Sequence, residues 1–143
     1  MAELPVKMGQ TVTFSKTVTE TDVVMFAGIS GDFAPPHTNA AYMETTSYGQ
    51  RIAHGALLVG YMSTASTMIA DGWGDPEVTA VSLGYDGIRF VAPVFFGDTV
   101  AVKYTVAELQ PERMRAVAEI EATNQRGEVV AVAKHIIKWV KND

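Results

Sequence analysis

The sequence predicts an α+β domain in which a largely antiparallel sheet wraps around one long central helix. Two features of the chain lead to this prediction. Residues 52–70 form an apolar segment without Asp, Glu, Lys or Arg, which is typical of a helix buried on most sides. After Pro76, apolar and polar residues alternate with period two, which is typical of strands. At 143 residues and 48% hydrophobic composition, residues 1–143 are expected to form a single domain.

The chain is expected to begin with a strand followed by a short helix. Residues 11–18 alternate valine, phenylalanine and lysine with threonine and serine, as in a strand. Thr19 and Asp22 have the spacing of a capping box, with Asp in place of the usual Glu or Gln. The helix that they start is expected to end near residues 28–31, where two glycines lie.

A loop over residues 32–37 is expected next, because Pro35 and Pro36 oppose helix formation and favour an extended residue before them. Asn39 is expected to cap a second short helix over residues 40–47. Because Asn39 caps the next helix, the loop before it is short, and its two prolines make it stiff.

The long helix is expected over residues 53–70, followed by a loop over residues 71–76. Its uncharged length approaches the roughly 20 residues of a membrane span. It also contains His54, two glycines and four Ser or Thr residues, so we interpret it as a core helix and expect no membrane association.

The second half of the chain is expected to contain five strands. They cover residues 78–86, 89–95, 99–110, 113–124 and 129–141. Residues 125–128 are predicted to form a hairpin turn, and residues 96–98 another. A sheet of this kind has open edges, which commonly pair between two copies, so we expect a homodimer or a higher homo-oligomer.

The overall composition limits the classes of function. The net charge of −5 provides no general attraction to nucleic acid. The chain has no cysteine, which excludes disulfides and thiolate chemistry and favours a cytoplasmic location. Its N-terminal residues lack the apolar run of a secretory signal. The three histidines lack the spacing of a metal site, so none is predicted.

Asp32 and His37 are the strongest candidates for chemistry. They lie five positions apart in the proline-containing loop. A carboxylate and an imidazole that face one small space can move protons to and from carbon. The alternative is a Gly-Asp turn before a helix, with His37 as an ordinary imidazole.

Three segments, in order, resemble the MaoC-like hydratases, also called hydratase-2 or (R)-specific enoyl-CoA hydratases, of the hot dog fold. The first runs from Phe26 to His37, the second is Tyr48-Gly49-Gln50-Arg51-Ile52-Ala53-His54-Gly55, and the third runs from Phe90 to Thr99. The chain departs from the family at three positions. Ala34 stands where the family usually has Asn, Pro36 replaces an aliphatic residue, and Asn39 replaces an Asp. These departures bear on substrate preference more than on reaction type.

The resemblance implies reversible syn addition of water to a trans-2-enoyl-CoA, giving an (R)-3-hydroxyacyl-CoA. Asp32 and His37 would activate the water and carry its proton to C2, in an order that the sequence leaves open. The Gly55 amide at the start of the long helix is the candidate donor to the thioester oxygen. Ser63 would hydrogen-bond within the site or pack in the core. No cofactor is expected, since CoA is part of the substrate.

Several further residues are candidates for substrate binding. His54 would bind substrate or orient the start of the helix, and a structural role is the favoured interpretation. Arg51 and Arg89 would contact CoA phosphates, or be solvated surface charges. Aromatic residues would line an acyl tunnel or belong to the core: Phe33, Tyr48, Tyr61 and Trp73. His135, in an alternating strand, is expected to be structural or solvent-facing.

Two other functions compete with hydration. Hot dog thioesterases share the fold but do not need Asp32 and His37 in this motif. A non-catalytic subunit of a hetero-oligomeric dehydratase is the other alternative, which Ala34 and Asn39 favour and the retained Asp32 and His37 oppose.

Overall fold

The computed structural model describes residues 3–70 and 77–143. Five strands, four α-helices and one 3-10 turn follow one another along this part of the chain. They are β1 (Thr11–Thr17), α1 (Glu20–Ser30), α2 (Pro35–Thr38), α3 (Ala40–Glu44), α4 (Gly55–Ile69), β2 (Val78–Phe90), β3 (Thr99–Gln110), the 3-10 turn (Pro111–Arg113), β4 (Arg115–Thr123) and β5 (Val129–Lys141).

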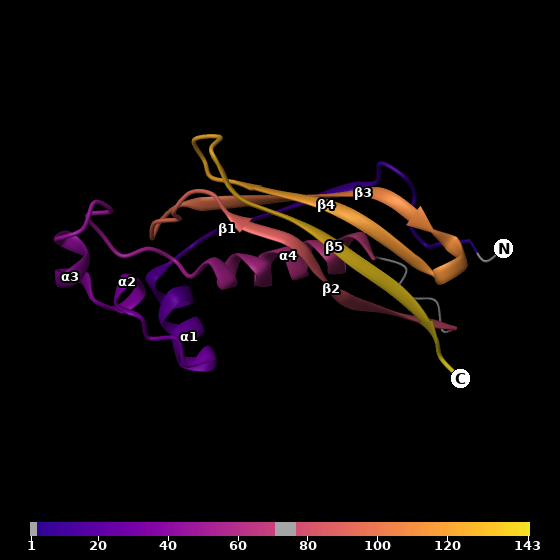
Figure 1. Ribbon diagram of the computed structural model, residues 1–143, viewed down its shortest axis with the longest axis horizontal. Helices are drawn as coiled ribbons and strands as arrows, with labels where there is room; N and C mark the ends of the chain where they lie inside the picture. The colour runs from indigo at the N-terminus through magenta and orange to yellow at the C-terminus, as the bar shows by residue number, and fades with distance from the viewer. Residues whose placement is uncertain (1–2, 71–76) are drawn as a thin grey trace.

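The strands form one antiparallel sheet in the order β1-β3-β4-β5-β2. The sheet curves along the length of α4, while α1, α2 and α3 gather at one end of the molecule, beside the start of α4 (Figure 1). This arrangement confirms the predicted α+β class with a sheet around one long helix. None of the described helices combines the length and apolar character that a membrane span requires.

The core lies between α4 and the sheet. Helix α4 directs Leu58, Met62 and Ile69 into it, and all three are at most 2% exposed. Alternate residues of β3, β4 and β5 supply the other side, as the period-two pattern predicts. Tyr61 also belongs to this core, because it is 7% exposed and its ring meets Phe14 edge-on at 6.0 Å.

Helix α1 is set by its ends, as predicted. The Thr19 hydroxyl accepts a hydrogen bond from the Asp22 N–H at 3.1 Å, and the Asp22 carboxylate accepts one from the Thr19 N–H at 2.9 Å. The helix ends where Gly31 adopts a left-handed conformation with φ 82°, which glycine reaches without a steric penalty. The chain turns there towards residues 32–37.

The prediction that the two prolines exclude helix was wrong. Pro35 and Pro36 occupy the first turn of α2, where a proline costs little because its missing N–H has no helical acceptor in any case. Asn39 caps α3 as predicted, accepting a hydrogen bond from the Tyr42 N–H at 2.9 Å. That helix ends at Glu44 and not at residue 47, and α4 begins at Gly55 and not at residue 53.

The two strands predicted for residues 78–86 and 89–95 are in fact one. Irregularities in the pairing with β5, between Ser82 and Gly84 and between Asp86 and Arg89, let β2 continue to Phe90. A bulge adds residues without ending a strand. Residues 96–98 form a turn, but not a hairpin, because β2 and β3 are not neighbours in the sheet. The predicted hairpin at residues 125–128 is confirmed between β4 and β5.

Candidate active site

The loop that carries Asp32 is held by its own side chains. The Ser30 hydroxyl accepts a hydrogen bond from the Asp32 N–H at 3.2 Å, and the Asp32 carboxylate accepts one from the Ala34 N–H at 3.1 Å. These bonds turn the chain sharply after α1 and leave the other carboxylate oxygen of an exposed Asp32 open to a ligand. Because the Ala34 contact is made by the backbone, it does not depend on which side chain stands at that position.

His37 has a defined tautomer. Its Nδ1 lies 2.8 Å from the carbonyl oxygen of Ile52, and because a carbonyl only accepts, Nδ1 must carry the proton. In the neutral ring, Nε2 is then the nitrogen with a free lone pair. The Ile52 N–H donates in turn to the Pro36 carbonyl at 3.0 Å. Ile52 therefore holds the short helix α2 at two consecutive residues, Pro36 and His37.

A second histidine lies directly against the first. The rings of His37 and His54 stack with centroids 3.6 Å apart and planes 21° from parallel. Side-chain atoms of Asp32, His37 and His54 that can bind a proton or a metal lie within 4.8 Å of one another. The fold thus joins residues that are 22 positions apart in the sequence.

This cluster does not have the geometry of a metal centre. A metal binds a histidine in the plane of the ring, at about 2.0–2.1 Å from the nitrogen. Two nearly parallel rings that are 3.6 Å apart do not share such a point. One nitrogen of each ring also already contacts a backbone carbonyl. The arrangement suits proton transfer.

A cavity of about 300 Å³ opens beside His37. It includes Gly55, whose N–H belongs to the first turn of α4 and has no acceptor within the helix. Most of the side chains that line it are apolar, and apolar surroundings strengthen a hydrogen bond. The lining residues are His37, Tyr48, Ile52, Ala53, Gly55, Leu58, Phe90, Val91, Ala92, Pro93 and Val94.

Phe90 is the closest neighbour of Gly55. A Cβ atom added to Gly55 would lie only 2.5 Å from Cδ2 of the Phe90 ring, so any larger residue here would force that ring or the start of α4 to move. From the sequence, Phe90 is noted only as part of a motif, and its place in the wall of the cavity becomes clear only in the structure. The motif Phe-x-x-Pro-Val, which begins at this residue, was the available signal.

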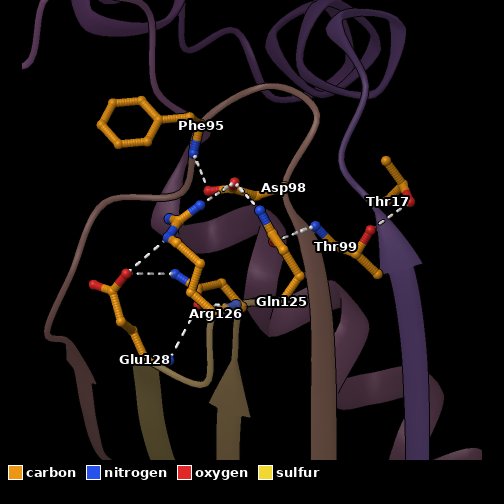
Figure 2. A network of polar contacts seen from close by, with 8 residues as sticks. Thr17, Phe95, Asp98, Thr99, Gln125, Arg126 and Glu128 are labelled. Carbon is orange, nitrogen blue, oxygen red and sulfur yellow. Dashed lines mark hydrogen bonds and ion pairs between the residues drawn. The ribbon is translucent and has the colours of Figure 1, made fainter.

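Asp98 and its partners fix the segment that supports the site (Figure 2). The Asp98 carboxylate, 5% exposed, accepts hydrogen bonds from the Phe95 N–H, the Gln125 amide and the Arg126 guanidinium. Burial raises the pKa of Asp98, but these hydrogen bonds outweigh it, and the pKa lies below its usual value. The network ties residues 94–98 to the hairpin between β4 and β5.

That segment in turn meets the residues before α4. The Val94 carbonyl accepts a hydrogen bond from the Ala53 N–H at 2.8 Å, and Phe95 pairs with Ile52 in an isolated bridge. Since Ile52 carries the carbonyl that binds His37, the network around Asp98 reaches the site through the backbone pairing of residues 94–95 with residues 52–53. The sequence analysis did not identify this role for Asp98.

The other predicted site residues lie in varied surroundings. Tyr48 lines the cavity, and Phe33 is 61% exposed. Arg51 forms an ion pair with Glu20 at 2.9 Å and lies over the ring of Phe96. Arg89 is exposed and donates to the carbonyl of its neighbour Ile88.

His37, Tyr48 and Gly55 line the cavity, whereas the other predicted site residues are not among its lining residues: Asp32, Phe33, Arg51, His54, Ser63 and Arg89. The lining passes from Ala53 to Gly55 without His54, which is 2% exposed. Ser63 lies on an exposed part of α4 and hydrogen-bonds Tyr85 of β2. Trp73 lies outside the described residues, as does the loop predicted at residues 71–76.

His135 lies in a buried polar cluster away from the cavity. Its Nδ1 is 2.7 Å from the Tyr104 hydroxyl and its Nε2 is 2.7 Å from the Ser82 hydroxyl. Both His135 and Tyr104 are fully buried. Burial lowers the pKa of His135 to about 4. Of the two roles expected for His135, the structural one is confirmed and the solvent-facing one was wrong.

Comparisons with known proteins agree with this geometry. A family model described as MaoC like domain matches residues 4–130. The chain is 39% identical over 108 residues to an (R)-specific enoyl-CoA hydratase of Rhodospirillum rubrum, covering 76% of this chain and 71% of that protein. It is 36% identical over 138 residues to a 3-hydroxybutyryl-CoA dehydratase of Methylorubrum extorquens, covering 96% and 83%.

A solved structure matches over almost the entire chain. The (R)-hydratase from A. caviae involved in PHA biosynthesis superposes with a TM-score of 0.84 at 28% identity, covering 94% of this chain and 97% of that one.

Proposed function

The chain belongs to the MaoC-like family and has the hot dog fold, and on that premise we propose that it hydrates a trans-2-enoyl-CoA to an (R)-3-hydroxyacyl-CoA, or catalyses the reverse dehydration. The observation that carries the proposal is the tautomer of His37. Its bond to Ile52 leaves Nε2 of the neutral ring as an acceptor. An oxygen of the Asp32 carboxylate lies within 4.8 Å of a ring nitrogen of His37, and His37 lines one cavity together with Gly55 at the start of α4.

In the proposed reaction, a water molecule binds between Asp32 and His37 Nε2. Both groups accept hydrogen bonds, so they orient the water and take one of its protons as its oxygen attacks C3 of the enoyl group. The electrons of the C2–C3 double bond move towards the thioester, and the proton taken from water is returned to C2. Attack and protonation from the same side give syn addition. The dehydration follows the same steps in reverse.

Gly55 supplies the second part of the mechanism. Negative charge develops on the thioester oxygen as the water attacks, and a free N–H at a helix N-terminus stabilises such charge by its hydrogen bond and by the helix dipole. The absence of a side chain at Gly55 lets the thioester approach the backbone. The reaction is redox-neutral, so it requires no electron carrier, and CoA enters as part of the substrate.

We also propose that the active form is a homodimer. Strand β2 lies at an edge of the sheet, with open hydrogen-bonding groups along one side. Exposed apolar residues lie within it, at its last position and directly after it: Leu83, Phe90 and Val91 are 45%, 51% and 57% exposed. A second copy paired at this edge would cover them and shield the cavity from bulk water. A cytoplasmic location is in keeping with the lack of cysteine.

The test of the proposed reaction is the loss of absorbance of the conjugated enoyl thioester when purified protein meets crotonyl-CoA. Asp32→Asn and His37→Ala serve as paired controls. Loss with the wild type alone, without release of free thiol, supports hydration. Thiol release would instead identify a thioesterase. No reaction with crotonyl-CoA or with longer or branched enoyl-CoAs would favour a non-catalytic subunit.

A further inference from the structure

His54 occupies the position before α4 but does not cap the helix with its side chain. Residues at this position are usually Ser, Thr, Asp or Asn, whose side chains accept a hydrogen bond from the first turn. The ring of His54 instead turns back into the loop of Asp32. Its Nε2 lies 2.9 Å from the Asp32 carbonyl oxygen, and because that oxygen only accepts, Nε2 carries the proton.

The same ring is enclosed by two others. His37 stacks on it at 3.6 Å, and Phe26 of α1 packs against it at 4.8 Å in a tilted arrangement. His54 therefore contacts both candidate catalytic residues at once, the loop of Asp32 through a hydrogen bond and the ring of His37 through stacking.

This arrangement lowers the stability of the fold, so it calls for an explanation other than stability. The Nδ1 atom of His54 is buried and has no hydrogen-bond partner among the described residues. A buried polar atom without a partner is unfavourable, and such atoms call for a specific explanation. A phenyl ring would fill the same space without the unpaired nitrogen but would lose the bond to Asp32.

We propose that His54 is a positioning residue that sets the distance and orientation of Asp32 and His37 relative to each other. The Nε2–H group of His54 fixes the backbone at Asp32. The ring of His54 fixes the rotation of the His37 imidazole, because the bond from His37 Nδ1 to Ile52 holds that imidazole at one end only. His54 acts through these two residues and does not touch the substrate. The kinetic test of this inference rests on the proposed function.

The test compares three substitutions that remove different parts of His54. His54→Gln keeps an N–H donor at similar reach but loses the stacked ring. His54→Phe keeps the ring but loses the donor. His54→Ala loses both and is expected to lower kcat about 100-fold with little change in KM, since a misplacement of about 1 Å can have that effect. The Gln and Phe variants should each recover part of kcat.

A double-mutant cycle with His37→Ala separates positioning from an independent role. If His54 acts through His37, adding His54→Ala to His37→Ala changes the remaining kcat only slightly. If the fold-loss of kcat in the double variant equalled the product of the two single fold-losses, the proposal would be overturned. A fall of kcat in all three variants that parallels their melting temperatures, or an effect on KM alone, would overturn it as well.

A readout without substrate distinguishes this inference from the proposed reaction. In the wild type, the ¹⁵N spectrum should show His37 as the single Nδ1–H tautomer, and His54→Ala should give a mixture. If the wild type failed to hydrate any enoyl-CoA but the tautomer changed as expected, the proposed function would fail and the positioning role would stand. An unchanged tautomer in His54→Ala would overturn the positioning role.

Discussion

Replacement of Gly55 by alanine tests how the start of α4 serves the reaction. The added Cβ would lie 2.5 Å from Cδ2 and 2.6 Å from Cε2 of Phe90, whereas ordinary van der Waals contact begins at 3.4 Å. The Phe90 ring or the start of the helix must therefore move by about 0.9 Å to reach that contact. Overpacking of this kind costs about 1–3 kcal/mol.

The lower end of that range is expected, because the Phe90 side chain is 51% exposed and has room to move. For a chain of 143 residues, a loss of 1 kcal/mol lowers the melting temperature by about 3 °C. The effect on catalysis should be larger. A displaced Gly55 amide no longer faces the developing charge, and we expect kcat for crotonyl-CoA to fall about 100-fold.

Gly60 provides the matched control on the same helix. A Cβ there meets no heavy atom within 4 Å, so Gly60→Ala should leave kcat unchanged and stabilise the helix by up to about 1 kcal/mol. Circular dichroism melts and initial rates of crotonyl-CoA hydration measure both effects.

The clash itself is tested in a Phe90→Ala background. If contact with Phe90 is the cause, Gly55→Ala should lower stability and kcat less in that background than in the wild type. The reasoning is refuted if Gly55→Ala keeps wild-type kcat and melting temperature, or if its effects are equally large without the Phe90 ring.

Three further predictions concern stability. The pKa of His135 falls from 6.5 to about 4 on folding. Between these pH values the unfolded chain binds a proton that the folded chain does not. The free energy of unfolding therefore decreases as the pH falls through this window, by about 3 kcal/mol in all. Urea unfolding at pH 7 and pH 4 should show a smaller decrease in His135→Gln, and an equal one would contradict the assignment. Asp98→Asn should cost about 1–3 kcal/mol, because it weakens three hydrogen bonds to a buried carboxylate. Glu128→Gln, which alters an exposed partner of the same arginine, should leave the melting temperature nearly unchanged, and equal losses would argue against the network. Thr19→Ala should destabilise the protein by about 1 kcal/mol through loss of the capping box, and an unchanged urea midpoint would show that the cap is dispensable.

Two departures from the family pattern leave the local fold intact. Asn39 accepts the hydrogen bond that caps α3, and Asp serves equally well at a helix N-terminus. The replacement at this position therefore leaves the local fold intact. At Ala34 the backbone N–H, and not a side chain, contacts Asp32, so the loop keeps its turn without the amide that the family usually carries.

The sequence by itself determined the class of fold and allowed Asp32 and His37 to be proposed as the central pair. Period-two alternation and one uncharged apolar segment are local signals, since they record which face of each element is buried. The capping box at Thr19 and the cap at Asn39 are equally local, because each depends on residues three positions apart. Asp32 and His37 could be proposed for the same reason, being close together in one short loop.

Only the tertiary structure decided how the site is assembled. The continuation of β2 through residues 86–89 depends on pairing with β5, which no local pattern encodes. The stacking of His54 on His37, the close approach of Phe90 to Gly55 and the support from Asp98 all join residues far apart in the chain. Such contacts arise when the sheet closes over α4 and brings distant segments to the same end of the helix. Their distances are therefore properties of the packed fold and not of any one segment.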